Sequence, residues 1–204
     1  MRIKYSRAAE YWMVLRLLSL AIMLCPQTAM AQQDNLRSYI TCDFGGKLSV
    51  EESDERAEPF VRSVNTLHGT KKIAVLHGFS LHIAYTGTPF VNFKAERLEH
   101  FASTKQTLID QLSAMAKGTK DMESKTPGEV SFNGFDVFAI DRTKLSGGVQ
   151  SVYLLFRDAD ETVVTLYILN TPREAPQFST IEQYRALSVA FLQAYTACVA
   201  NNLK

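Results

Sequence analysis

The chain has 204 residues, 46% of them hydrophobic, and its 22 basic and 21 acidic side chains nearly cancel. Nucleic acids and anionic membranes select proteins with a local concentration of basic charge, so this balance excludes both as the main partner. The chain has no repeat of fixed period and no low-complexity tract.

The amino-terminal segment has the pattern of an export signal. Four basic residues between Arg2 and Arg16 precede an apolar run over 17–24, and Ala29-Met30-Ala31 then supplies the small-x-small motif that signal peptidase recognises. We predict cleavage of residues 1–31 after Ala31 and a periplasmic or secreted location. Removing this segment leaves 18 basic and 20 acidic residues, a net charge of about −2, on a 173-residue chain that suits a single domain, 32–204.

Two other fates of this segment are a lipid anchor and a retained transmembrane helix. A lipid anchor on Cys25 would need a small residue before the cysteine, but Leu24 stands there. A retained transmembrane helix over 11–25 would be interrupted by Arg16 and shorter than the roughly 20 residues that a span needs. We therefore expect no stable membrane insertion, with the retained helix as the alternative.

The first predicted element of the mature chain is a strand over 38–44, whose alternation places Ile40, Cys42 and Phe44 on one apolar face. The last predicted helix carries an apolar stripe at spacings of three and four, made by Ile181, Tyr184, Leu187, Phe191, Tyr195 and Cys198. Two inward cysteines in an oxidising compartment predict a Cys42–Cys198 disulfide, which would contribute on the order of 4 to 5 kcal/mol by loop closure. The alternative is two separate buried thiols. A redox-active pair is disfavoured, because no C-x-x-C motif occurs.

The charged run 51–58 (EESDERAE) predicts a solvated loop or a short helix, and it lacks the fixed geometry of an acidic cation site. Strands are predicted over 72–77, 80–86 and 90–95, separated by turns at Gly78 and at 87–89. The motif Ser103-x-x-Gln106 predicts a capping box that opens a helix ending at Gly118. The inner face of this helix would carry Phe101, Leu108, Leu112 and Met115.

Strands are predicted over 135–141, 149–157 and 162–169, the last two joined by the polar turn 158–161. The motif Ser179-x-x-Glu182 predicts the cap of the last helix, which ends near Asn201. The order strand-helix-strand-helix predicts an α+β domain: an antiparallel sheet with two helices packed on it, held by one disulfide.

Part of this pattern resembles a known family. The segment NGFDVF over 133–138, the hairpin VQSVYLLFRDADETVVTLYIL and a helix beginning after Phe178 are similar to the second half of PsbP-like exported proteins. The resemblance extends over 72–200 in element order and over 133–198 in residue pattern. It implies an accessory or binding role rather than a reaction.

Catalysis has little support in the sequence. No G-x-S-x-G motif occurs, and the closest serine contexts are Gly78-Phe79-Ser80 and the loop LSGG over 145–148. Both mature cysteines are accounted for by the predicted disulfide. We therefore predict no catalytic residue and no enzyme activity, with a small hydrolase as an alternative.

Histidines and aspartates were considered as metal ligands. If Gly78-Phe79 formed a tight turn, His77 and His82 would lie on neighbouring strands and, with His68, converge on zinc or copper. A surface or edge-strand role is favoured, because no further ligand is offered. Asp158 and Asp160 suggest calcium but lack the other oxygens and the glycine of an EF-hand loop, so a hairpin turn is favoured. We predict no metal and no cofactor.

Three aromatic residues, Tyr153, Phe156 and Tyr167, are candidates for a ligand groove, although core packing is more common. Alternation puts Tyr153 and Phe156 on opposite faces, so one of them should leave the helix-covered face and offer a protein-binding patch. We predict an exported, soluble, non-catalytic binding protein whose partner is an envelope or secreted protein, as in immunity or assembly. A small-molecule or metal carrier is the first alternative.

Overall fold

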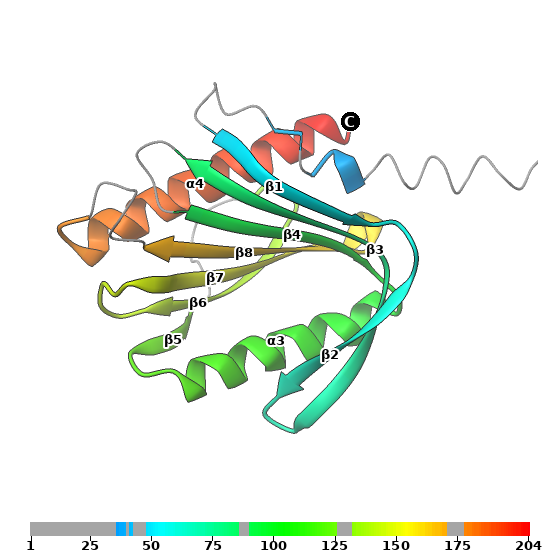
Figure 1. Cartoon of the computed structure of the whole chain (residues 1–204), viewed down its shortest axis with the longest axis horizontal. Coiled ribbons are helices and arrows are strands. Elements are labelled where there is room, and N and C mark those ends of the chain that lie inside the picture. The colour runs from blue at the N-terminus through cyan, green and yellow to red at the C-terminus, as the bar shows by residue number, and fades with distance from the viewer. Residues whose placement is uncertain (1–35, 40, 43–47, 86–89, 126–131, 171–177) are drawn as a thin grey trace, which may run out of the picture. The chain divides into compact units, whose positions relative to one another are not determined.

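A computed structural model of the chain describes residues 36–39, 41–42, 48–85, 90–125, 132–170 and 178–204. The predicted signal segment and its cleavage site lie outside these residues, which all belong to one unit, Leu36–Lys204. Within them, eight strands form one antiparallel sheet in the order β1-β3-β4-β8-β7-β6-β5, with β2 also paired to β3 (Figure 1). The strands are β1 (Leu48–Arg56), β2 (Phe60–Thr66), β3 (Gly69–Tyr85), β4 (Phe90–Leu98), β5 (Met122–Lys125), β6 (Asp136–Arg142), β7 (Gly148–Arg157) and β8 (Thr162–Asn170).

Two helices complete the fold and lie on opposite faces of the sheet. Helix α3 (Phe101–Gly118) packs on one face, here called the α3 face, and helix α4 (Ile181–Asn202) on the other (Figure 1). Four strands, a helix, four strands and a helix follow one another, which confirms the predicted class and refines its order. Among the described residues, no helix is long and apolar enough to cross a membrane.

Strand β7 shows why the central strands are apolar on both sides. Tyr153 and Leu155 belong to the core under α4, while Leu154 and Phe156 belong to the core under α3. Tyr153 and Phe156 therefore lie on opposite faces, as predicted. The expectation that one of them leaves the covered face is wrong, because each face has its own helix and the two residues are only 6% and 1% exposed.

The turn predicted at Gly78 is also wrong, because β3 runs through it as a 17-residue strand. Strand β2 pairs with the first half of β3, where Phe60 faces Val75, and β1 pairs with the second half, where Arg56 faces Gly78. A Cβ atom on Gly78 would lie 3.2 Å from the Phe60 ring. The glycine therefore permits a close approach between strands rather than a chain reversal.

The charged run 51–58 is not a loop or helix, because most of it lies in β1. Among the described strands, β1 pairs only with β3 and so occupies an edge of the sheet. Edge strands accommodate charged side chains because one side of them stays in contact with solvent.

The hairpin of β2 and the first half of β3 curves over α3 (Figure 1). Val64, Ile73 and Val75 from this hairpin join Leu108 and Leu112 of α3 in one core cluster. The register between β3 and β4 shifts between Val75 and His77, where the hairpin leaves the flat part of the sheet. Bulges of this kind increase local twist and bend a strand.

The strand predicted over 38–44 is not present in its described part, because residues 36–39 form a helical turn and 41–42 have no regular structure. Ile40 and Phe44 lie outside the described residues. The predicted disulfide between Cys42 and Cys198 is confirmed, with a Cα–Cα distance of 5.8 Å. The hydroxyl of buried Tyr39 donates to Asp160 Oδ2 at 2.7 Å, and the Tyr195 hydroxyl donates to the Tyr39 carbonyl at 2.9 Å. This short segment is thus fixed to the domain by side chains as well as by sulfur.

The helix ends differ from prediction by a few residues. Helix α3 ends at Gly118 as predicted, but its N-cap is His100, and Ser103 Oγ donates to the His100 carbonyl instead of capping. Helix α4 is capped by Thr180, whose hydroxyl accepts from the Gln183 amide, one position beyond the predicted box. The strands β6, β7 and β8 begin and end within one residue of the predicted bounds.

Candidate functional site

The histidines do not lie on neighbouring strands. His77 and His82 are five positions apart on the same strand, and His68 is exposed beside the β2–β3 turn. His77 Nε2 lies 3.0 Å from Glu55 Oε1, while the His82 side chain lies outside what the structure describes. Among the described residues, no group of three or more His, Cys, Asp or Glu side chains could hold a metal ion.

The two aspartates of the β7–β8 turn are bound to cations of the protein itself. Asp158 Oδ1 accepts from Lys105 Nζ at 3.1 Å, and Asp160 Oδ2 accepts from Arg157 Nη1 at 2.8 Å. Residues 158–160 form a short 3₁₀ helix between the strands. Both aspartates are therefore held in ion pairs with side chains of the protein.

The serine contexts do not form a nucleophile–base pair in the described part of the chain. Ser146 donates its backbone N–H to Gln150 Oε1 at 3.0 Å, as part of the β6–β7 connection. No described histidine side chain is hydrogen-bonded to the hydroxyl of Ser80 or Ser146. Ser80, however, lines a cavity.

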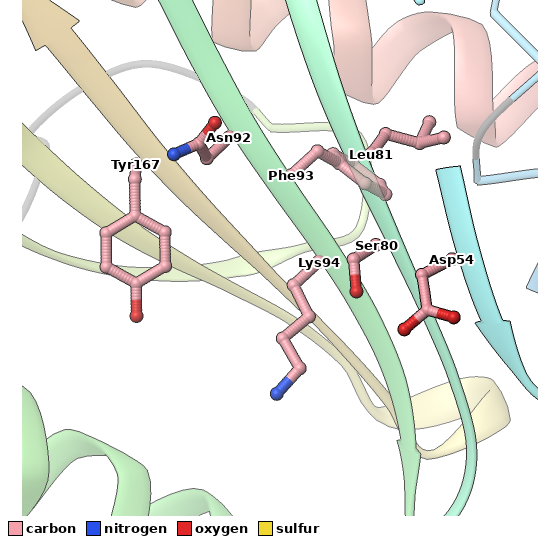
Figure 2. A pocket seen from close by; sticks show the side chains of 7 residues that line it. All are labelled: Asp54, Ser80, Leu81, Asn92, Phe93, Lys94 and Tyr167. Carbon is pink, nitrogen blue, oxygen red and sulfur yellow. The ribbon is translucent and has the colours of Figure 1, made fainter. Parts of the chain in front are cut away.

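This cavity lies on the sheet beyond the part that α3 covers, and we call it the sheet pocket. It has a volume of about 390 Å³ and is lined by Asp54 of β1, Ser80 and Leu81 of β3, Asn92, Phe93 and Lys94 of β4, and Tyr167 of β8. Figure 2 shows the side chains of Asn92, Lys94, Ser80 and Tyr167 around one space, with Leu81 and Phe93 directed away from it. Polar side chains and one aromatic ring, that of Tyr167, thus point into the pocket.

The strand register brings these side chains together. Asp54 faces Ser80, Ser80 faces Lys94, and in the next row Asn92 faces Tyr167. Directly opposed residues of an antiparallel pair share a face and lie about 5 Å apart. The pocket is therefore built on four strands rather than on loops, which gives its polar groups fixed positions.

A second cavity adjoins the sheet pocket and lies beside an ion cluster around the buried Glu96. It has a volume of about 180 Å³ and shares Asp54, Ser80 and Lys94 with the first. Glu96, whose side chain is 0% exposed, accepts two hydrogen bonds from Arg62, Nε to Oε1 at 2.8 Å and Nη2 to Oε2 at 2.7 Å. Lys94 Nζ lies 2.6 Å from Glu96 Oε1. One carboxylate is therefore shared by two cations.

The charges around the two cavities do not cancel. Among the side chains that the structure describes here, the cations Arg56, Arg62 and Lys94 line the cavities with the anion Asp54, and the anion Glu96 lies directly behind Lys94. Burial lowers the pKa of Lys94, and nearby Arg62 and Arg56 lower it further, while Glu96 opposes the shift. Burial raises the pKa of Tyr167, so its hydroxyl stays neutral. The site carries one excess positive charge.

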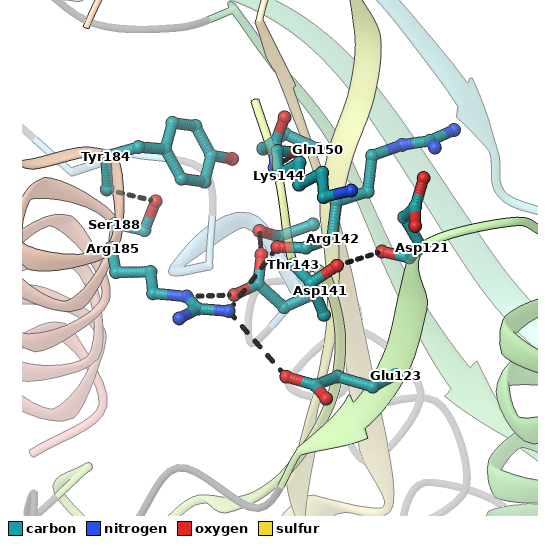
Figure 3. Close-up of polar contacts among 11 residues, drawn as sticks. Asp121, Glu123, Asp141, Arg142, Thr143, Lys144, Gln150, Tyr184, Arg185 and Ser188 are labelled. Atoms are coloured by element: carbon teal, nitrogen blue, oxygen red, sulfur yellow. Dashed lines mark hydrogen bonds and ion pairs between the residues drawn. The ribbon is translucent and has the colours of Figure 1, made fainter. Parts of the chain in front are cut away.

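A second polar cluster lies on the opposite face, and Figure 3 shows it between α4 and the strands. Asp141 is buried and accepts from Ser151 Oγ at 2.8 Å and from Arg185 Nε at 2.7 Å. Burial and the Asp141 charge raise the pKa of Tyr153 to about 12. Both carboxylate oxygens of Asp141 are occupied, so we assign this cluster to anchoring α4 on β6 and β7.

The comparisons give no relative from which a role can be read: no protein-family model, no curated protein and no solved structure matches this chain. The PsbP-like resemblance therefore stays a prediction.

Of the aromatic candidates, only Tyr167 lines the sheet pocket, since Tyr153 and Phe156 are core residues. The sequence analysis missed Lys94 and Glu96. The alternation VNFKAE over 91–96 contains a signal for them, because polar residues occupy every second position of a strand whose other face is apolar.

Proposed function

We propose that the chain is a non-catalytic binding protein that acts outside the cytoplasm, in the periplasm or as a secreted protein, and holds a small ligand in the sheet pocket. The observation that carries the proposal is a cavity of about 390 Å³ whose polar walls are set by the register of four strands. Small-molecule sites are typically concavities of roughly 300–1,000 Å³ with a few well-placed polar groups. The Cys42–Cys198 disulfide supports a location outside the cytoplasm.

A binding role fits the pocket better than a reaction. Ser80 and Lys94 face each other across β3 and β4, but a serine–lysine hydrolase needs a neutral amine hydrogen-bonded to the hydroxyl. The Lys94 amine instead lies 2.6 Å from the Glu96 carboxylate, so its contact is with an acid rather than with the Ser80 hydroxyl. The described residues therefore offer polar contacts for a ligand and no activated nucleophile.

The test is co-purification of a ligand with the exported protein. The full-length chain is expressed with export, and native mass spectrometry of the purified product is compared with the mass after denaturation. In Ser80→Phe, a bulky ring fills the pocket, while Ser124→Phe places the same ring at an exposed position of β5. We expect an added mass in the parent and in S124F that is absent in S80F. An added mass retained in S80F would contradict the proposal.

A protein partner is the second candidate, and the β2–β3 hairpin favours it. Val61 and Leu67 are 63% and 45% exposed and are the large hydrophobic residues that the described part of the chain leaves exposed. An envelope or secreted protein, in an immunity or assembly role, would bind there. We expect Val61→Asp with Leu67→Asp to abolish capture of such a partner from an envelope extract, and unchanged capture would exclude the hairpin.

A further inference from the structure

We infer that the ligand of the sheet pocket is a small organic acid with a single negative charge, whose carboxylate lies at Lys94 and whose planar apolar part lies against the Tyr167 ring. This inference rests on the proposed function, because it names the chemical class of the same ligand.

The charge of the ligand follows from the charges on the protein. Arg56, Arg62 and Lys94 outnumber Asp54 and Glu96 by one around the two adjoining cavities. An uncompensated charge in a partly buried site is costly, and an opposite charge held close to it removes that cost. A monoanion brings the site to neutrality, whereas a dianion such as a phosphate monoester would leave one negative charge in excess. A cation would add to the existing excess.

The position of the acid group follows from the different contacts of the two partly buried cations, Arg62 and Lys94. The Arg62 guanidinium gives two hydrogen bonds to Glu96 and lines only the smaller cavity. The Lys94 ammonium has three donors, lies 2.6 Å from Glu96 Oε1 and lines both cavities. Ser80 faces Lys94 across the strands and also lines both cavities, so its hydroxyl and the Lys94 ammonium belong to the same shared wall. A carboxylate accepts from such a pair of donors.

The Tyr167 ring indicates the chemical nature of the part of the ligand that lies away from Lys94. This ring stands across the pocket from Lys94 and belongs to the strand next to Asn92, which it faces directly (Figure 2). Among the side chains that point into the space, it is the aromatic one, so it offers a flat surface for stacking. The pocket thus accommodates a planar group at one end and an acid at the other, in a volume of about 390 Å³.

The test uses a matched series of probes with one ring and different charges: phenylacetate, phenylacetamide, phenethylammonium and phenyl phosphate. Each is titrated into the exported protein, and binding is followed by NMR shifts of the Lys94 backbone and Asn92 side-chain amides. We expect phenylacetate to bind at least about tenfold more tightly than the amide, as a charge-assisted hydrogen bond implies. The ammonium and phosphate probes should bind more weakly than phenylacetate.

Two variants and one control locate the effect. Lys94→Gln should reduce phenylacetate affinity about tenfold and bring it close to that of the amide. Lys105→Gln is the control, because Lys105 is also ion-paired but with Asp136 and Asp158, away from the pocket. Tyr167→Leu should weaken all four probes while keeping their order. Circular dichroism shows whether each variant is folded. If K94Q does not fold, Y167L still tests the inference.

Equal affinity for acid and amide, tighter binding of phenyl phosphate, or the absence of shifts at Lys94 and Asn92 with every probe would each overturn the inference. A retained mass in S80F overturns the proposed function instead, so the two failures are distinguishable.

Discussion

At the scale of single residues, Glu96 organises the candidate site. Its fully buried carboxylate contacts both Arg62 and Lys94 and so orients them. The neighbouring β4 residues Phe93 and Ala95 point to the other face of the sheet and are apolar. A buried ion pair contributes little net stability compared with well-packed apolar residues. We therefore interpret Glu96 as a positioning residue that holds the Lys94 ammonium at the wall of the sheet pocket.

Arg62→Ala should destabilise the protein strongly, because it leaves the buried Glu96 carboxylate with Lys94 alone. We expect a loss of about 3 kcal/mol in the free energy of unfolding, measured by urea denaturation. The matched control is Arg37→Ala, whose partner Glu55 is 3.5 Å away and whose side chain is 63% exposed, and which should cost less than about 1 kcal/mol. The double variant Arg62→Met, Glu96→Leu should recover most of the loss. Equal costs for R62A and R37A would contradict this account.

The raised pKa of Tyr153 predicts a loss of stability at alkaline pH. An unfolded tyrosine ionises near pH 10, while in the folded protein Tyr153 stays neutral up to its raised pKa of about 12. The stabilisation is therefore complete below pH 10 and is lost as the pH rises toward 12. The free energy of unfolding falls between about pH 9 and about pH 11.5, and this fall should be about 2 kcal/mol smaller in Tyr153→Phe than in the parent. Parallel pH profiles of the two proteins would refute this assignment.

Part of the fold was predictable from residues alone, but the arrangement of the site was not. The opposite faces of Tyr153 and Phe156 follow from periodicity, and the structure confirms them. The Cys42–Cys198 pairing is confirmed as well, although the strand that was expected to carry Cys42 is not present in its described part. The alternation around Lys94 shows that one face of the strand is polar. It does not show that Arg62 lies on the same face. Arg62 is 34 positions from Glu96 in the sequence, and the pairing of β2 with β3 brings the two side chains together.

At the scale of elements, β3 shows how a local turn signal is overridden. Gly78 interrupts an alternating run, and glycine with polar neighbours is typical of turns. The strand continues because Gly78 is flanked by partners on both sides, with Arg56 on β1 and Glu96 on β4. The same non-local pairing converts the charged run of β1 into an edge strand. Neither partner can be identified from local sequence.

Gly78→Ala tests whether this glycine serves packing. An added Cβ would lie 3.2 Å from two atoms of the Phe60 ring, so the ring must shift, and overpacking of this kind costs about 1 to 2 kcal/mol. Gly118→Ala is the control, because a Cβ there would meet nothing within 4 Å at the end of α3, and it should be neutral or slightly stabilising. Thermal denaturation compares the two. Adding Phe60→Leu to G78A should relieve the strain, and an unchanged stability in G78A would show that Phe60 moves freely.

At the scale of the whole molecule, the two faces of the sheet differ in how far a helix covers them. Helix α4 covers one face, where Asp141 and Arg185 fix it, and residues 36–39 lie against that side through the contact of Tyr39 with Tyr195. Helix α3 contacts β2, β5, β6 and β7 and leaves the polar stretch of β4 to the sheet pocket. The closed face supplies stability, and the partly open face supplies the candidate site.

The disulfide should stabilise this arrangement as a whole, because it joins residues 156 positions apart, near the two ends of the folded unit. Replacing both cysteines, Cys42→Ser with Cys198→Ser, removes the loop constraint on the unfolded chain and should lower the unfolding free energy by about 4 to 5 kcal/mol. Reduction of the parent protein should give the same loss in urea denaturation, since both treatments open the same loop. Tyr39 would still anchor the segment through Asp160, so the variant should fold and keep the phenylacetate affinity of the sheet pocket on the opposite face. Two titratable thiols in the unreduced exported protein, or equal stability with and without reductant, would show that sulfur does not hold the ends together.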